Sequence, residues 1–406
     1  MGIIAIWQNQ LHAKYLISGT KLNMENQSYS DWRKKLHRRA EEKRALLRVM
    51  FELTYRCNFA CRHCYIPQRY KAPSRRELKT KEVFCILDQL RDVGCFYLGF
   101  TGGEPFIRED ILDILWYAKR LGFEIIVYTN GSLLTKKKIG ELSNIRPNKI
   151  DITLPGMSRE AFERTSKVAG SRNKVFQAIA LLHKAGINLG FKACQLKDNI
   201  SELSEMRDFA VSMGAPFRFD DLFFPRLDGS REPFKQRASN DEVNGDLAGR
   251  IRMGGSEYPG RRPVNRQRLS NKTNSTGKAG ALFKCGVGIS QAAISPQGEL
   301  KMCVMIDYPK YKIPVGAQTF GKSSIGKPGL EHIWRKLQRL VKGIAPDKDY
   351  QCASCDVSDL CKWCPARSWI MHKSFCRCVP ESREWAVLRK QDTRTMNIER
   401  SAGCVS

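Results

Sequence analysis

Three cysteines separated by short gaps constrain this chain more than any other feature of its sequence. Cys57, Cys61 and Cys64 follow an apolar run at 47–54 that we expect to be a strand. Thiolates are soft ligands that suit zinc or iron–sulfur clusters. A structural zinc site requires a fourth ligand close by, and the ring of His63, between two of these cysteines, is poorly placed to reach the same metal. The spacing therefore favours a four-iron cluster with one iron left open.

A second group of cysteines lies nearer the C-terminus and reads C-x12-G-x4-C, then C-x2-C-x5-C-x2-C, then a last pair. Its members are Cys285, Cys303, Cys352, Cys355, Cys361, Cys364, Cys376 and Cys378. Two structural zinc sites built from these eight thiolates are an open alternative to iron–sulfur clusters. The chain is too long for a secreted disulfide scaffold, so we interpret its 15 cysteines mainly as metal ligands. Cys85, Cys95 and Cys194 lack such spacing, and we expect them to be small buried hydrophobes.

Strand-like and helix-like segments alternate between the two cysteine groups. The expected strands are 47–54, 95–100, 124–128, 149–154, 187–194 and 216–223, and the expected helices are 80–93, 110–121, 135–142, 159–165, 174–185 and 201–213. This order predicts an α/β fold with a parallel sheet, in the form of a partial (β/α)6 barrel. In such sheets, ligands bind at the carboxyl ends of the strands.

The pattern divides the chain into five expected parts. These are an N-terminal extension with a basic helix (1–46), the partial barrel (47–225), a basic linker or insertion (226–280), a small cysteine-rich iron–sulfur domain (281–380), and a C-terminal helix and tail (381–406). Further helices are expected at 31–46, 330–341 and 382–390.

The C-x3-C-x2-C spacing, followed by the aromatic Tyr65, resembles the signature of the radical S-adenosylmethionine (SAM) superfamily. Gly102-Gly103-Glu104, at the end of the second expected strand, resembles the family's GGE motif, and Asn130 ends the third strand as it does in relatives. The likeness covers roughly residues 47–224. It implies a 4Fe–4S cluster that binds SAM at its open iron and cleaves it reductively to a 5′-deoxyadenosyl radical, which abstracts a hydrogen from a substrate.

The same resemblance implies roles for individual side chains. Glu104 would hold the methionine amino group of SAM, and the two glycines before it would let the backbone approach the ligand. Tyr65 and Asn130 are further candidates for the cofactor site, and Thr153, Lys192 and Gln195, at strand ends, are candidates for contacts with the ribose and adenine. Asp220 and Asp221, at the sixth strand, could act as acid–base groups or could simply be a solvated strand end.

The C-terminal cysteines resemble the SPASM domain, which carries auxiliary iron–sulfur clusters in many radical SAM enzymes. The family pattern has three residues where this chain has two, between Cys361 and Cys364. The resemblance implies one or two auxiliary clusters. One would use Cys352, Cys355, Cys361 and either Cys376 or Cys378, and the other would use Cys285, Cys303 and Cys364.

This likeness favours a maturase that modifies a ribosomally made peptide or a protein. Val304 stands where the sulfatase-maturing branch has an aspartate, which argues against that branch. A separate adaptor protein is expected to deliver a peptide, because the 46 residues before the barrel are few for a recognition domain. The alternatives are tetrapyrrole side-chain modification in the haem pathway, then RNA modification, then an iron–sulfur electron carrier without catalytic activity. The GGE motif argues against the carrier, which needs no SAM pocket.

The net charge of +28 favours acidic partners, although the excess of basic residues is spread along the chain. An electron donor such as flavodoxin or ferredoxin is implied by the chemistry. Nucleic acid is not expected as a partner, because no RNA-binding module is recognisable. We find no signal peptide and no apolar stretch of about 20 residues, so we expect a cytoplasmic protein with no membrane contact.

Overall fold

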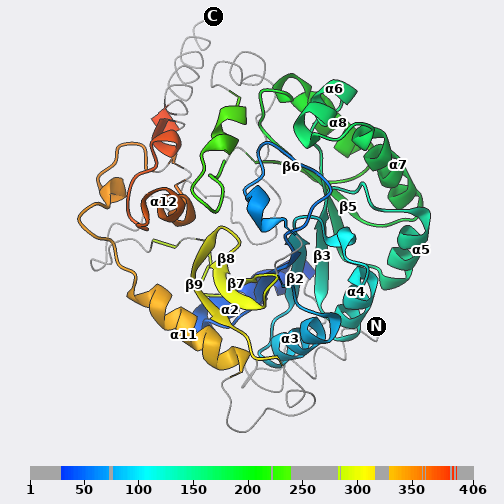
Figure 1. Ribbon diagram of the computed structural model, residues 1–406. Coiled ribbons are helices and arrows are strands. Elements are labelled where there is room, and N and C mark those ends of the chain that lie inside the picture. The colour runs from blue at the N-terminus through cyan, green and yellow to red at the C-terminus, as the bar shows by residue number, and fades with distance from the viewer. Residues whose placement is uncertain are drawn as a thin grey trace, which may run out of the picture.

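A curved sheet of nine strands forms the centre of the molecule, with helices along its outer side (Figure 1). The computed structural model describes residues 29–72, 76–220, 223–238, 282–283, 285–315, 329–358, 360–361, 363–384, 386–387 and 390. The strand order is β6-β5-β4-β3-β2-β1-β7-β8-β9. The first six of these strands run parallel to one another and do not close into a full barrel, which confirms the expected partial barrel.

The alternation of strands and helices follows the sequence prediction closely. The parallel strands are β1 (Arg48–Thr54), β2 (Tyr97–Gly102), β3 (Glu124–Thr129), β4 (Lys149–Thr153), β5 (Leu189–Cys194) and β6 (Phe217–Asp220). The helices are α3 (Thr80–Asp92), α4 (Ile111–Arg120), α5 (Lys136–Ile145), α6 (Arg159–Ser166), α7 (Ser171–Lys184) and α8 (Leu203–Ser212), with short 3₁₀ helices η1 (Gln68–Tyr70), η2 (Pro105–Ile107), η3 (Ile200–Glu202) and η4 (Glu232–Gln236). The second strand starts later than expected and runs into the GGE motif, and the helix expected at 201–213 is divided into η3 and α8.

Local sequence signals set where these helices begin. Glu82 accepts a hydrogen bond from the backbone N–H of Lys79 at 2.8 Å and so satisfies a donor at the start of α3. The Ser158 hydroxyl accepts from the N–H of Ala161 at 3.1 Å and is the N-cap of α6. Each cap satisfies backbone donors that the first helical turn leaves unpaired, and so fixes the helix next to its strand.

Three strands of the sheet come from the cysteine-rich part of the chain and were not predicted. They are β7 (Gln291–Ile294), β8 (Glu299–Cys303) and β9 (Ile306–Lys312). Strand β7 pairs in parallel with β1, and β8 and β9 continue the sheet in antiparallel fashion. Helices α11 (Leu330–Gly343) and α12 (Pro365–His372) and the 3₁₀ helix η6 (Gln351–Ala353) follow. The C-terminal cysteines are therefore attached to the barrel through a shared sheet.

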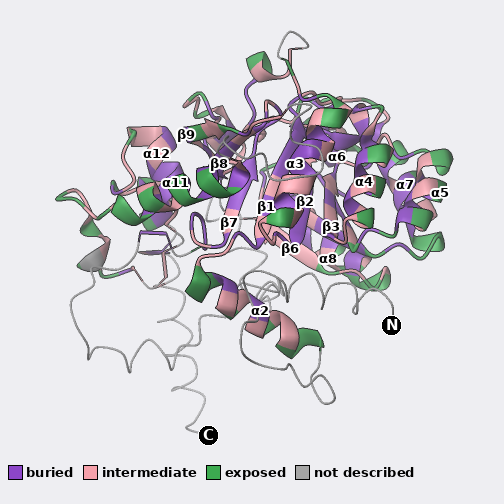
Figure 2. Cartoon of the chain, turned by 90° about the horizontal axis from the view of Figure 1, so that it is seen from below, coloured by how far each residue is buried: buried purple, intermediate pink, exposed green. Residues whose placement is uncertain are grey.

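The apolar core is also continuous between the barrel and the C-terminal elements (Figure 2). Val49 and Phe51 of β1 belong to the same buried cluster as Leu300 of β8 and Leu337 of α11. Helix α2 (Tyr29–Lys43), in the region of the predicted basic helix, packs Leu36 and its neighbours against the residues that precede β1 and β2. None of the helices within the described ranges has the length and apolar character that crossing a membrane requires.

The segment that we expected to be a linker or insertion begins as packed structure. Leu227 is buried and donates its backbone N–H to Tyr65 O at 2.9 Å, beside the first cysteine group. Ala238 is buried as well and donates its N–H to Gln195 O at 3.3 Å, just beyond β5. The remainder of that segment, 239–280, lies outside the described residues.

Candidate functional site

The first cysteine group lies in a loop directly after β1, at the carboxyl end of a parallel strand. Phe59 donates its backbone N–H to Cys57 Sγ at 3.4 Å, and Cys64 donates its N–H to Cys61 O at 3.2 Å. Ala60 bonds to the carbonyl that ends α6 at 3.0 Å, so the loop is fixed to the barrel through its backbone. Within the described ranges, no three His, Cys, Asp or Glu side chains form a group that could hold a single metal ion. A four-iron cluster instead binds each thiolate through a different iron.

Burial controls the protonation of these thiols. It raises the pKa of Cys57 to about 11 and raises the pKa of Cys61 further, and neighbouring thiolates add to both shifts. The ammonium of Lys71 lowers the pKa of both thiols, and its Nζ donates to Phe59 O at 3.4 Å inside the loop. Because metal ligands must be deprotonated, binding at this loop would release protons. Lys71 offers a charge that offsets the thiolates, and no spacing in the sequence pointed to it.

His63 lies between Cys61 and Cys64 and is held in its neutral form. Burial, followed by Lys192 and Lys71, lowers its pKa to about 4, so its imidazole is neutral near pH 7. Its Nδ1 is buried and has no hydrogen-bond partner among the residues that the structure describes.

Gly102 and Gly103 bring the end of β2 against the start of the cysteine loop. Gly103 donates its N–H to Thr54 O at 2.8 Å. A Cβ on Gly102 would lie 2.1 Å from Thr54 O, and one on Gly103 would lie 2.2 Å from Arg56 O. Gly102 also has φ +134°, where side chains are strained. We expected these glycines to admit a ligand, but their close approach in the structure is to the chain's own backbone.

Glu104 joins the ends of β2 and β3 and has no exposed surface. Its Oε1 accepts from Thr129 Oγ1 at 2.7 Å and from Phe106 N at 3.0 Å, and its Oε2 accepts from Asn130 N at 2.7 Å. Burial raises its pKa, and these donors oppose the shift. A carboxylate offers about four acceptor positions, so Oε2 can still accept a bond from an ammonium. The side-chain amide of Asn130 lies 4.0 Å from Cys57 Sγ, which places the GGE motif beside the cysteine loop.

The remaining cofactor candidates lie at the ends of β4 and β5. Thr153 and Lys192 are register partners in these strands, and Lys192 Nζ lies 5.5 Å from the ring centroid of Tyr128. Gln195 follows β5, and its Oε1 is buried without a hydrogen-bond partner in the described part of the chain. A buried acceptor left in this state costs about 1–3 kcal/mol, so a bound ligand that donates to it would be favoured. These groups fit a cluster with bound SAM. The three thiols could bind iron, and the buried carboxylate and the unpartnered Gln195 oxygen could accept hydrogen bonds from SAM.

The acid–base candidates are less well placed. Asp220 ends β6, and its Oδ1 lies 3.2 Å from Arg218 Nε, while 41% of its side chain is exposed. Asp221 lies outside the described residues. Cys194, which we expected to be a buried hydrophobe, is only partly buried at the end of β5. Burial raises its pKa to about 12, and Asp220 and Cys64 raise it as well, so this thiol lies at the same end of the sheet as the first cysteine group.

The C-terminal cysteines form separate groups, of which the first contains Cys285, Cys303 and Cys364. Burial raises the pKa of Cys303 to about 12, and the thiolates of Cys364 and Cys285 contribute to that shift. Burial likewise raises the pKa of Cys364, again with a contribution from Cys285. The three thiols that the sequence assigned to one auxiliary cluster therefore influence one another in the structure.

The second group contains Cys355, Cys361 and Cys378. Burial raises the pKa of Cys361, and the Cys378 and Cys355 thiolates raise it further. Burial also raises the pKa of Cys378, with Cys355 as the next contribution. Cys361 Sγ donates to Ser382 O at 3.5 Å, which ties this group to the segment after α12.

Cys376 and Cys352 both lie near Tyr350. Burial raises the pKa of Tyr350, and the thiolates of Cys352 and Cys376 add to the shift. The Cys376 side chain is 3% exposed, and its Sγ donates to Ala345 O at 3.7 Å. Of the two candidates for the closing cysteine, Cys378 therefore lies near Cys355, and Cys376 lies near Cys352.

A buried charged network lies under the first cysteine loop, and nothing in the sequence predicted it. Glu52 of β1 accepts from Lys301 Nζ of β8 at 2.8 Å, and the two side chains are 0% and 2% exposed. Glu52 also accepts from Tyr65 OH at 3.0 Å and from Tyr55 OH at 3.2 Å. Removing one partner of such a buried pair costs about 3–5 kcal/mol, because the other charge is left uncompensated.

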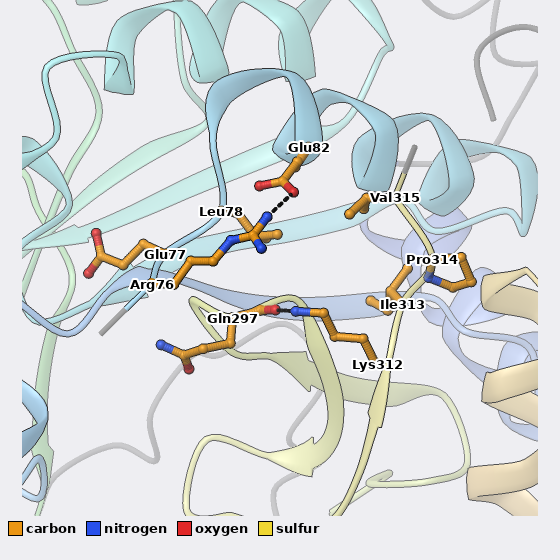
Figure 3. A pocket seen from close by; sticks show the side chains of 9 residues that line it. All are labelled: Arg76, Glu77, Leu78, Glu82, Gln297, Lys312, Ile313, Pro314 and Val315. Atoms are coloured by element: carbon orange, nitrogen blue, oxygen red, sulfur yellow. Dashed lines mark hydrogen bonds and ion pairs between the residues drawn. The ribbon is translucent and has the colours of Figure 1, made fainter. Parts of the chain in front are cut away.

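A surface pocket with no cysteine in its lining lies between the start of α3, the turn from β7 to β8 and the end of β9 (Figure 3). It is lined by Arg76, Glu77, Leu78, Glu82, Gln297, Lys312, Ile313, Pro314 and Val315. Arg76 and Glu82 are ion-paired at 2.9 Å, and Lys312 Nζ donates to Gln297 O. Glu77 accepts from Thr54 Oγ1 at 2.5 Å, which links the pocket wall to the strand before the cysteine loop. Most of the polar groups that line the pocket are therefore already paired with other groups of the protein.

Comparison with known proteins identifies relatives for most of the chain. Residues 51–210 match the radical SAM superfamily. The AdoMet-dependent heme synthase of Oleidesulfovibrio alaskensis is 22% identical over 339 residues, which is 80% of this chain and 84% of the relative. The mycofactocin maturase MftC of Mycolicibacterium smegmatis is 25% identical over 323 residues, which is 77% of this chain and 76% of the relative.

Solved structures show the same fold at low sequence identity. Streptococcus suis SuiB bound to the precursor peptide SuiA superposes with a TM-score of 0.56 at 16% identity, covering 93% of this chain and 86% of SuiB. The protein anSMEcpe with bound AdoMet and the Kp18Cys peptide gives a TM-score of 0.58 at 12% identity, covering 87% of this chain and 99% of that one. The fold described above is therefore shared well beyond the parallel strands.

Proposed function

We propose that this chain is a radical SAM enzyme that cleaves SAM reductively and modifies a peptide, because residues 51–210 match the radical SAM superfamily. This family implies SAM and a 4Fe–4S cluster. When bound, they supply the electron transfer and the radical chemistry that abstracts a substrate hydrogen. The arrangement around Cys57, Glu104 and Asn130 is the observation that carries the proposal, because it joins the thiol loop to a buried carboxylate at one end of the sheet.

Different residues of the chain would bind the cluster and SAM. Cys57, Cys61 and Cys64 would hold the cluster, and Lys71 would offset part of its negative charge. Glu104 would accept a hydrogen bond from the methionine ammonium of SAM at Oε2, which accepts one hydrogen bond, from Asn130 N, among the described residues. Burial of this carboxylate excludes water, which strengthens an ion pair formed there.

The strand ends beyond Glu104 would orient the rest of SAM. Gln195 Oε1 has no partner among the described residues, so a ribose hydroxyl or the adenine amino group would satisfy it. Thr153 and Lys192 lie at the ends of the neighbouring strands and would complete this side of the site together with Tyr65.

The C-terminal thiols would hold auxiliary clusters. We assign Cys285, Cys303 and Cys364 to one cluster, and Cys355, Cys361 and Cys378 to another, to which Cys352 belongs by spacing. The sheet shared by β1 and β7 supports a role for these clusters in the reaction, since it ties them to the barrel. A cytoplasmic one-electron donor of the flavodoxin or ferredoxin class would supply electrons, and an acidic donor would suit the net charge of +28.

A peptide substrate is supported by the relatives and the fold neighbours. MftC is named a maturase, and the SuiB structure contains its precursor peptide. The heme synthase relative, which covers a similar share of the chain, supports side-chain modification of a haem-pathway tetrapyrrole as the second candidate. A separate adaptor that delivers the peptide is part of the first proposal only.

The first experiment tests the cluster and SAM cleavage together. The anaerobically reconstituted, reduced enzyme should release 5′-deoxyadenosine, and Cys61→Ala should abolish the release and remove about four irons per chain. Cys85→Ala is the matched control, because Cys85 is buried in α3 away from the cysteine loops. Retained cleavage in Cys61→Ala would contradict the assignment. Total iron of about four with two zinc ions would support zinc in the C-terminal part instead.

The substrate class is tested by stimulation of that cleavage. A small peptide encoded beside the gene should increase 5′-deoxyadenosine formation and gain a mass change that tracks it. Stimulation by Fe-coproporphyrin III, with no response to the peptide, would overturn the peptide proposal in favour of the porphyrin.

A further inference from the structure

Two cysteine loops, one from the N-terminal half of the chain and one from the C-terminal half, are attached to the same buried carboxylate. Glu52 Oε1 accepts from the hydroxyl of Tyr65, the residue that follows Cys64, at 3.0 Å. Its Oε2 accepts from Nζ of Lys301, which lies two residues before Cys303, at 2.8 Å. A single side chain of β1 therefore connects the first cysteine group to the C-terminal cysteines.

The Lys301 side chain also reaches across the turn that contains Cys303. Its Nζ donates to Val304 O at 3.5 Å and to Tyr55 OH at 3.4 Å, in addition to Glu52. One ammonium thus contacts the residue after Cys303 on one side and the strand before the first cysteine loop on the other. Three donors matched to three acceptors leave this ammonium little freedom of orientation.

Both strands lose their regular pairing immediately after the paired charges. The register of β1 with β2 shifts between Glu52 and Thr54, and that of β8 with β9 shifts between Lys301 and Cys303. Irregularities of this kind re-aim the side chains that follow them. The ion pair therefore lies where the directions of the two cysteine loops are set.

Stability alone does not account for a lysine at this position. Well-packed apolar residues in place of a buried ion pair are often equally stabilising or more so. An apolar side chain, however, could not bind the Glu52 carboxylate and the Val304 carbonyl together, and so could not tie β8 to β1 at this point.

We propose that Lys301 is a positioning residue that, through Glu52, fixes the turn carrying Cys303 relative to the loop carrying Cys64. The inference rests on the proposed function only in taking these cysteines as cluster ligands. Lys301 acts on Cys303 through its hydrogen bond to the backbone carbonyl of Val304. Tyr65, which is bonded to the other oxygen of Glu52, acts on Cys64 because it is the next residue in the chain. The proposal adds a link between the two sites that the cysteine spacings do not contain.

The test measures how fast each cysteine of the full-length reconstituted protein is alkylated under anaerobic conditions, resolved by mass spectrometry. Lys301→Met should accelerate alkylation of Cys303 about tenfold, as expected for loss of a hydrogen bond to a charged group. Lys310→Met is the matched control, because Lys310 is the register partner of Lys301 on β9 and its side chain is 50% exposed. It should leave the alkylation of Cys303 unchanged.

A double variant separates positioning from stability. Glu52→Gln with Lys301→Met leaves no uncompensated charge, so its melting temperature should return toward the wild-type value while Cys303 stays rapidly alkylated. Tyr65→Phe should accelerate only Cys64. Equal Cys303 rates in Lys301→Met and Lys310→Met, or a double variant that restores both melting temperature and protection, would overturn the proposal. The comparison needs no turnover, so a failure of SAM cleavage would be recognised separately.

Discussion

Asn130 donates its backbone N–H to Oε2 of Glu104 at 2.7 Å, which joins the ends of β3 and β2 through one buried carboxylate. The side chain of Asn130 points the other way, with Nδ2 4.0 Å from Cys57 Sγ. The GGE motif, the end of the third strand and the first cysteine loop are thereby held as one unit. We expect changes to this carboxylate to affect both the fold and the binding of SAM.

Glu104→Gln tests this dual role. The amide would place an NH₂ group against backbone or hydroxyl donors, so we expect a loss of about 2 kcal/mol in the free energy of unfolding and a clear loss of SAM affinity. Urea unfolding and equilibrium binding of SAM to the reconstituted protein measure the two effects. Glu109→Gln, an exposed neighbour, serves as the control and should change neither. Unaltered SAM binding in Glu104→Gln would contradict its assignment to the methionine amino group.

The two candidates for the closing cysteine can be compared directly. Cys378→Ser should lower the iron content of the reconstituted protein by up to about four per chain, because Cys378 lies with Cys355 and Cys361. If Cys378 is the closing ligand, Cys376→Ser should retain most of the iron. Iron and acid-labile sulfide analysis of both variants measures the difference. Greater iron loss in Cys376→Ser would reverse the assignment.

Glu124, at the start of β3, gives the protein a stability that falls with rising pH. Burial raises the pKa of this carboxyl to about 7 from its ordinary 4.5, and Tyr29 OH donates to Oε1. Between these two values the folded chain binds more protons than the unfolded chain, so the free energy of unfolding decreases as the pH rises.

Glu124→Gln should remove that slope, which urea midpoints measured between about pH 5 and 8 under argon will show. Glu160→Gln, exposed on α6, is the control and should reproduce the wild-type profile. A Glu124→Gln profile that keeps the wild-type slope would show that another group is responsible.

Local sequence was sufficient for the barrel and for the first cysteine group. Helical spacing in α3, with its capping residues, and apolar runs such as β1 report on neighbours only a few residues away, so their signals survive in the sequence. The ligand spacing of Cys57, Cys61 and Cys64 is local in the same sense. These features alone predicted the parallel sheet and the edge at which the site lies.

Tertiary structure alone decided how the two cysteine groups are related. Strand β7 has only four residues, and its partner β1 lies more than 200 positions earlier, so no local pattern in the sequence indicates that they pair. The ion pair between Glu52 and Lys301 depends on that pairing, because β8 reaches β1 only through β7. Likewise, Cys376 and Cys378 have equivalent spacings in the sequence, and only the folded loop places one thiol against Ala345 O and the other beside Cys355. These arrangements depend on contacts between segments that are distant in the sequence, and local sequence patterns do not predict such contacts.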